Sequence, residues 1–131
     1  MYTMIRLKSL LESALPPTGQ VTKQLFDYLL SQVEAEALET AHKTWNEFTP
    51  KECNNGWCDL FADKLQSFLP GSVIWETKDS GMGTYGHVWI EWKDKYYDSE
   101  TLHGVSNWQQ LPWMNRFYKT KGNYPEVAKL S

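Results

Sequence analysis

The spacing of apolar residues changes once along this chain of 131 residues, near residue 70. Before that point apolar side chains recur every three or four positions, which is the period of an amphipathic helix. After it, apolar and polar residues alternate over 72–77 and 86–99, as they do in half-buried strands. Helices followed by antiparallel strands are typical of the α+β class. We therefore expect a single domain over 1–131.

The helical part of this domain is predicted over 1–48. Within it, the apolar positions predict one helix over 4–15 and a long amphipathic helix over 22–45. Thr49-Pro50 is expected to end the second helix. The residues at 51–57 have the composition of a loop. Apolar positions then resume the helical spacing, so Cys58 lies at or just before the first turn of a further helix, which ends before Pro70-Gly71.

The remaining core, over 50–131, is expected to be this Cys-containing helix packed on a small antiparallel sheet. The strand over 72–77 is followed by a Gly-containing loop over 78–85 and a hairpin over 86–99. A turn centred near Lys93-Asp94 would place residues whose numbers sum to about 185 to 187 opposite each other. This register brings Asp98 or Tyr97 near the residues from His87 to Ile90. In the tail, 106–111 is predicted to be a short capped helix that ends at Pro112, before an irregular aromatic segment.

Alternation along the hairpin predicts what each face of it contacts. His87, Trp89 and Glu91 share one face, and the more aliphatic set of Val88, Ile90 and Trp92 shares the other. We expect the aliphatic face to cover the core and His87 to face a cleft. Trp57, Trp89 and Glu91 are the residues predicted to wall that cleft, and Glu91 is a second candidate for orienting His87.

Charge and composition exclude several classes of partner. The net charge is −3 and the basic residues are scattered, so we expect no nucleic-acid partner. The apolar runs are short and the N-terminus does not resemble a signal peptide, so we expect no membrane partner and a cytoplasmic protein. Cys53 and Cys58 are both expected to be thiols. With His42, His87 and His103 they form no paired ligand motif, so no metal and no cofactor is predicted, and the oligomeric state stays open.

Cys58 is the candidate nucleophile because of its place at a helix start. Free backbone N–H groups and the helix dipole at that end favour a thiolate. The backbone N–H of Cys58 is itself free to bind an oxyanion, and Gly56 lets a substrate approach the backbone closely. Cys53 has no helix start directly after it and is the expected bystander.

Taken singly, the candidate residues have ordinary explanations. A free cysteine is most often a small buried apolar residue, a histidine at a strand start is most often a polar edge residue, and an aspartate after a strand is most often a turn residue. Together, Cys58, His87 and Asp98 supply a nucleophile, a base and a group that orients the base, each on the type of element that this chemistry needs. Their order therefore favours a catalytic interpretation.

Three short motifs resemble the papain-like cysteine hydrolases, especially the transglutaminase-like proteins and the NlpC-type cysteine peptidases. They are Gly56-Trp57-Cys58, Gly86-His87-Val88-Trp89-Ile90-Glu91, which is similar to the His-x-Trp-x-Glu stretch of transglutaminase-like domains, and Tyr96-Tyr97-Asp98. The resemblance covers roughly 50–100. It implies a thiol hydrolase that acts on an amide or peptide bond of a peptide or protein substrate through a thioester, as a peptidase, amidase, deamidase or cross-linking enzyme.

The resemblance also implies a role for each site residue. Cys58 is the nucleophile, His87 the general base and acid, and Asp98 the residue that orients the imidazole. The chain departs from the family in two places: Trp57 stands where NlpC-type enzymes usually have an aspartate, and only Asn54 and Asn55 offer the side-chain amide that papain-type enzymes use as an oxyanion donor. An alternative from another class is a catalytically silent, papain-like binding module, for example one encoded by a virus or mobile element.

Overall fold

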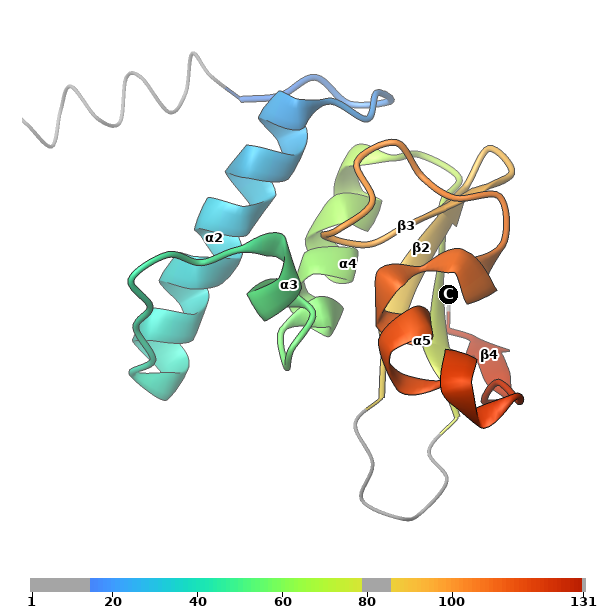
Figure 1. Cartoon of the computed structure of the whole chain (residues 1–131). Coiled ribbons are helices and arrows are strands. Elements are labelled where there is room, and N and C mark those ends of the chain that lie inside the picture. The colour runs from blue at the N-terminus through green and yellow to red at the C-terminus, as the bar shows by residue number, and fades with distance from the viewer. Residues whose placement is uncertain (1–14, 79–85, 131) are drawn as a thin grey trace, which may run out of the picture.

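The computed structural model of this chain describes residues 15–78 and 86–130. In this part, four strands form one antiparallel sheet in the order β3-β2-β1-β4. Helices α2 and α4 lie on one side of the sheet and α5 lies on the other (Figure 1). The α+β class and the small antiparallel sheet are therefore confirmed. The predicted helix over 4–15 and the loop residues 79–85 lie outside the described residues.

The longest helix, α2 (Lys23–Ala41), is amphipathic as predicted. Its first turn is capped by Thr22, whose side chain accepts a hydrogen bond from the Leu25 N–H at 3.1 Å. The apolar pattern predicted that this helix would extend to residue 45. It ends at Ala41 instead, because His42 adopts a left-handed backbone with φ of 53°. The His42 N–H bonds back to Leu38 O, which closes the helix.

A short helix, α3 (Pro50–Cys53), replaces the first residues of the loop predicted over 51–57, and the rest of that range is a turn without regular structure. Thr49 and Glu52 form a capping box, in which each side chain reaches the other residue's backbone N–H. Pro50 occupies the first helical turn, where its missing N–H costs nothing. Thr49-Pro50 therefore marks the start of a helix and not the end of one. The prediction of a loop was wrong at 51–53.

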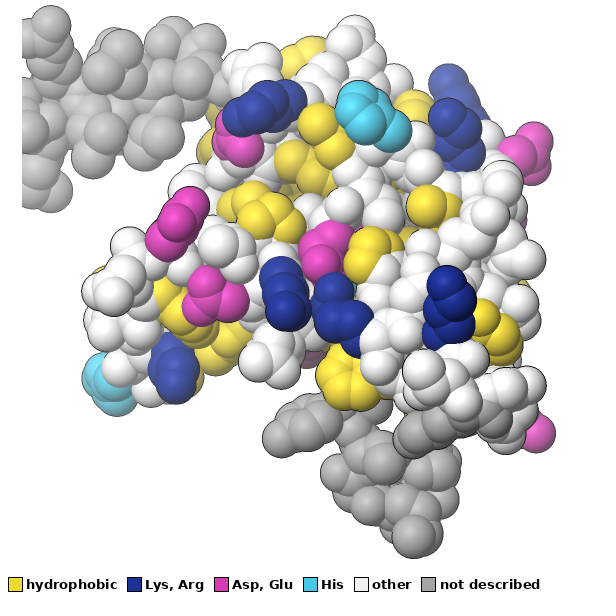
Figure 2. Space-filling view, in the orientation of Figure 1, with side chains coloured by type: hydrophobic (Ala, Val, Ile, Leu, Met, Phe, Trp, Pro, Cys, Tyr) yellow, Lys and Arg dark blue, Asp and Glu magenta, His cyan; other side chains and the backbone are white. Residues whose placement is uncertain are grey.

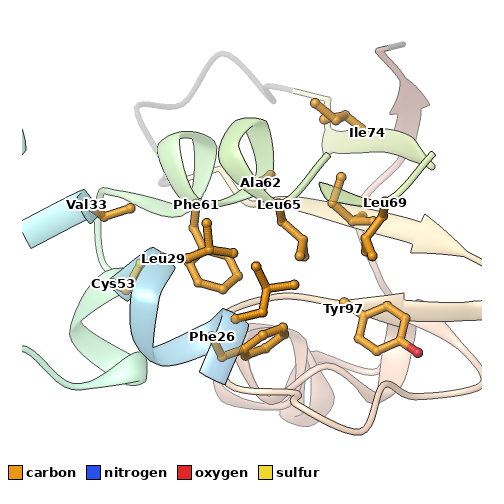
Figure 3. Packing of buried hydrophobic residues seen from close by; sticks show 12 residues of the cluster. Phe26, Leu29, Val33, Cys53, Phe61, Ala62, Leu65, Leu69, Ile74 and Tyr97 are labelled. Carbon is orange, nitrogen blue, oxygen red and sulfur yellow. The ribbon is translucent and has the colours of Figure 1, made fainter. Parts of the chain in front are cut away.

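The next helix, α4 (Cys58–Phe68), begins at Cys58, as the sequence predicts. The turn between α3 and α4 requires Gly56, whose φ is +114°, a value that residues with a Cβ rarely adopt. One face of α4 packs on α2 and on the sheet, and Figure 3 shows Phe61, Leu65 and Leu69 converging with residues of both.

The sheet contains the predicted hairpin. Its strands are β1 (Val73–Thr77), β2 (Val88–Trp92), β3 (Lys95–Tyr97) and β4 (Val127–Lys129). Lys93 and Asp94 both have positive φ, at 49° and 65°, as a two-residue hairpin turn requires. Ile90 pairs with Tyr97, which agrees with the predicted register.

The tail is more regular than expected. Asn107 caps a 3-10 turn (Trp108–Gln110), but Pro112 begins α5 (Pro112–Phe117) instead of ending the ordered segment. A second 3-10 turn (Lys119–Lys121) follows, and β4 then returns to pair with β1. The tail therefore supplies both the cover on the second face of the sheet and one of its edges.

Two apolar clusters hold the sheet from opposite sides. The first joins α2, α4 and the face of Ile74 and Ile90. The second is largely aromatic and joins the face of Trp89 to Trp113 and Met114 of α5. On the surface seen in Figure 2, side chains of both charge signs are intermingled. Within the described ranges, no helix is both long and apolar enough to cross a membrane.

Candidate active site

Cys58 opens α4 at the edge of a surface groove. Its side chain is free of disulfide and 8% exposed. The groove has a volume of about 660 Å³ and runs between α4 and the strands β1 and β2. Among the described residues, no side chain caps the first turn of α4, which leaves the N–H groups at the helix start without a side-chain partner. The thiol is therefore mostly sheltered but reachable from one side.

His87 and Asp98 form a buried hydrogen-bonded pair. His87 Nε2 and Asp98 Oδ2 are 2.9 Å apart, and the side chains are 0% and 1% exposed. The pair follows from the hairpin register, because Asp98 continues β3 one residue beyond the Ile90–Tyr97 pair. Asp98 thus fixes the ring orientation of His87 and leaves the other ring nitrogen, Nδ1, for a second partner.

Cys58 lies near the imidazole but makes no hydrogen bond with its Nδ1. Nδ1 of His87 makes no hydrogen bond of standard geometry, yet Cys58 is near enough to influence the protonation of His87. Because Asp98 occupies Nε2, the thiol can interact with the ring only through Nδ1. A loose contact of this kind is common in enzymes without substrate, where catalytic hydrogen bonds are often long.

The pair and the thiol together favour the imidazolium form of His87. Burial by itself lowers the pKa of His87, but the hydrogen bond with Asp98 and the interaction with Cys58 outweigh burial. The net effect raises this pKa from 6.5 to about 9. The raised pKa therefore favours a positively charged ring at neutral pH, in the neighbourhood of Cys58.

Two threonines that the sequence analysis missed hold this pair in place. Thr77 accepts a hydrogen bond from the His87 N–H at 3.0 Å. Thr101 accepts one from the Asp98 N–H at 2.7 Å and donates one to Asp98 Oδ1 at 3.2 Å. The signal for Thr101 was its place three residues after an aspartate, a spacing typical of side-chain-to-backbone turns. Thr77 had no such signal, because it lies on another strand.

His87 does not face an open cleft, which corrects our expectation. Its ring stacks on Trp113 with centroids 4.8 Å apart and an interplanar angle of 12°, and on Trp89 at 5.8 Å. The face that His87 shares with Trp89 is covered by α5, an element that the sequence analysis did not predict. The imidazole is therefore screened from water on that side, and substrate can reach the site only from the side of Cys58.

The predicted cleft walls have other contacts. Trp57 is half-buried and packs on Trp45, with centroids 6.1 Å apart. Trp89 is fully buried beneath the site. Glu91 accepts a hydrogen bond from Trp75 Nε1 at 2.9 Å, so Asp98, and not Glu91, orients His87.

The side-chain oxyanion candidates do not line the groove of Cys58. Asn54 is 2% exposed, and its Nδ2 donates to Glu100 Oε2 at 2.7 Å. Asn54 and Asn55 line a separate hollow of about 440 Å³ beside α5. Of the three candidates, the backbone N–H of Cys58 is the one located at the groove.

Glu100 is a further residue that the sequence analysis missed. Besides Asn54, it binds Arg116 of α5 through two hydrogen bonds of 2.9 and 2.8 Å. A bidentate carboxylate–guanidinium pair of this kind has a defined geometry. Through Asn54 and Arg116, Glu100 joins α3 and α5 to the segment that follows Asp98. These contacts hold α5 in place over His87.

The other cysteine and the other two histidines do not line the groove of Cys58. Cys53 is fully buried, and burial raises the pKa of its thiol to about 12. Both thiols are free. His42 lies at the C-terminal cap of α2 and His103 is exposed in a loop. Over 15–78 and 86–130, no cluster of His, Cys, Asp and Glu has the arrangement of a metal site.

Comparison of this chain with models of known families, with curated proteins and with solved structures finds no match. The function therefore has to be argued from the geometry of this site.

Proposed function

We propose that this protein is a small cysteine hydrolase that cleaves an amide or peptide bond through a thioester on Cys58. A papain-like arrangement of helix and sheet is part of the proposal. The observation that carries it is the buried His87–Asp98 pair beside a thiol at a helix N-terminus. A buried ion pair of this type is costly unless every member is satisfied, so its presence supports a functional role.

Each residue has one chemical task in this proposal. The Cys58 sulfur attacks the carbonyl carbon, and the negative oxygen that results is held by N–H groups at the start of α4. The C–N bond then breaks, and the leaving nitrogen takes the proton from Nδ1 of His87. Water attacks the thioester, His87 accepts a proton from this water, and the acid and the free thiol are released. Asp98 keeps the imidazole oriented through both steps.

A labelling experiment tests the proposal without a known substrate. Cys58 alkylation by limiting iodoacetamide should persist well below pH 8, because the His87 imidazolium favours the thiolate. In His87→Gln the rate at pH 6 should fall by about tenfold or more. Peptide mapping by mass spectrometry separates Cys58 from Cys53.

The matched control is His103→Gln, which changes an exposed histidine away from the site. Its alkylation profile should equal that of the unmodified protein. A Cys58 rate that rises with pH as for a free cysteine, with no change in His87→Gln, would contradict the proposal.

A second candidate is a binding module that uses the same fold without catalysis. The complete burial of His87 beneath Trp113 favours it, since a catalytic base usually has some access to substrate. On this hypothesis Cys58→Ala leaves the biological effect of the protein unchanged, whereas the hydrolase loses activity.

A further inference from the structure

We infer that the groove beside Cys58 selects a cationic substrate, a peptide segment that carries a lysine or arginine side chain near the amide to be cleaved. This inference rests on the proposed function, because it treats the groove as the substrate site of the Cys58 thiol. It adds the chemical class of the substrate, which neither the motifs nor the triad geometry defines.

The groove has an acidic rim next to the thiol. Asp59 and Asp63 lie one turn apart on α4, and Glu76 lines the same groove from β1. No Lys or Arg is among the described residues that line the groove. Lys78, which follows Glu76 by two positions, is not part of this lining. Three carboxylates around one hollow produce a negative potential that attracts cations.

These carboxylates differ from the paired acids elsewhere in the molecule. Asp27, Glu36, Asp98 and Glu100 each have a basic partner within 4 Å: Lys23, Lys64, His87 and Arg116, respectively. Over the described ranges, Asp59, Asp63 and Glu76 have no such ion pair. Their charge is therefore available to a ligand.

The rest of the lining fits a long apolar stem below a charged head. Leu60, Ile74, Val88 and Leu130 supply apolar surface, and Gly56, where an added Cβ would meet nothing within 4 Å, leaves open space. Lysine and arginine bury their methylene stems on apolar surface and keep the charged group in a polar rim. The acids do not converge into a metal site in the described part of the chain, so a small inorganic cation suits the groove less well than an extended organic one.

Two thiol reagents of similar size and opposite charge test the inference. They are 2-(trimethylammonium)ethyl methanethiosulfonate and 2-sulfonatoethyl methanethiosulfonate, and the measurement is their rate of reaction with Cys58 at low salt. We expect the cationic reagent to react about tenfold faster than the anionic one. This ratio should shrink in 0.5 M salt, which is roughly three times physiological ionic strength.

Neutralising any one acid of the rim should reduce the preference of Cys58 for the cationic reagent. Asp59→Asn, Asp63→Asn and Glu76→Gln are each expected to lower the ratio by about two- to threefold. Asp94→Asn is the matched control, because it makes the same change of net charge at the hairpin turn, outside the groove. A ratio that falls equally in Asp94→Asn reflects only the net charge of the protein and overturns the inference.

A protection assay tests the substrate class itself. At equal concentration, N-acetyl-lysine amide should slow alkylation of Cys58 by iodoacetamide more than N-acetyl-norleucine amide, which has the stem without the charge. Equal protection, or a reagent ratio near one, overturns the cationic preference. If alkylation still depends on His87 in that case, the proposed function stands; if that dependence is absent, the proposed function itself fails.

Discussion

Cys53 and Cys58 are five positions apart in the sequence and lie in opposite environments. Cys53 ends α3 inside the apolar core, where its thiol is fully buried and its Sγ lies 4.0 Å from Trp57 O. Cys58 begins α4 at the groove, beside an imidazole that a buried carboxylate keeps protonated. We expect the two thiols to differ in reactivity for this reason, because each occupies a different end of a helix and meets different side chains.

The largest expected difference between the two cysteines is in catalysis. Cys58→Ala should lower hydrolysis of fluorogenic peptide amides by about a thousandfold or more, because the covalent step is lost. Cys53→Ala should keep kcat/KM within about twofold, since this thiol does not line the groove. Circular dichroism of both variants checks that the fold is retained. Equal activity in the two variants would remove the functional distinction between the cysteines.

The region of Cys58 should also make stability depend on pH. The pKa of His87 is raised from 6.5 to about 9, so folding gains stability from the protonated ring that is fully present below pH 6.5. The free energy of unfolding should therefore fall as the pH rises from 6.5 towards 9, by about 3 kcal/mol at most. Urea titrations measure it, in a Cys58→Ser background so that the thiol does not titrate.

Asp98→Asn is the control for this pH dependence, because it removes the carboxylate that keeps the ring charged. Its stability should vary much less between pH 6.5 and 9. The same slope in both proteins would mean that another group titrates.

The burial of Cys53 should instead affect the stability of the protein, through the packing of the core. Cys53→Ser places a hydroxyl in the apolar core and is expected to cost about 1 to 2 kcal/mol of unfolding free energy. Cys58→Ser, at the first turn of α4 and beside solvent, should cost less than about 0.5 kcal/mol. Thermal and urea unfolding of both variants tests this, and a larger loss for Cys58→Ser would reverse the comparison.

An effect no larger than that of Cys53→Ser is expected at the support of Asp98. Thr101→Val keeps the shape of the side chain but removes its hydrogen bonds to the Asp98 N–H and Oδ1. We expect a loss of about 1 kcal/mol in stability and a few-fold lower alkylation rate of Cys58 at pH 6. Thr40→Val is the matched control, because that hydroxyl bonds only within an exposed turn of α2. An unchanged alkylation rate in Thr101→Val would mean that Asp98 needs no such support.

Local patterns predicted the elements that form the site. Alternation and the turn at Lys93-Asp94 predicted the hairpin and its register, and the return of apolar spacing predicted the start of α4 at Cys58. These features depend on neighbours within a few residues, which is why they can be read locally. The capping box of Thr49 and Glu52 was equally local and was missed, because Pro50 was interpreted as the end of one helix and not as the start of another.

Contacts between distant segments could not be predicted in this way. Trp113 on His87, Arg116 on Glu100 and the pairing of β4 with β1 all depend on where the tail returns to the sheet. The prediction that His87 faces a cleft failed for this reason, since alternation identifies a face of a strand but not the element that covers it.

The amino-acid sequence by itself determined the class of fold, the helix start at Cys58 and the proximity of His87 to Asp98, because each follows from backbone periodicity and one tight turn. The tertiary structure alone decided which thiol is buried in the core, which side chains screen the imidazole, and that three carboxylates from α4 and β1 share a groove with Cys58. Burial and charge neighbours arise from contacts between distant segments, and they decide whether the same side chain is structural or reactive.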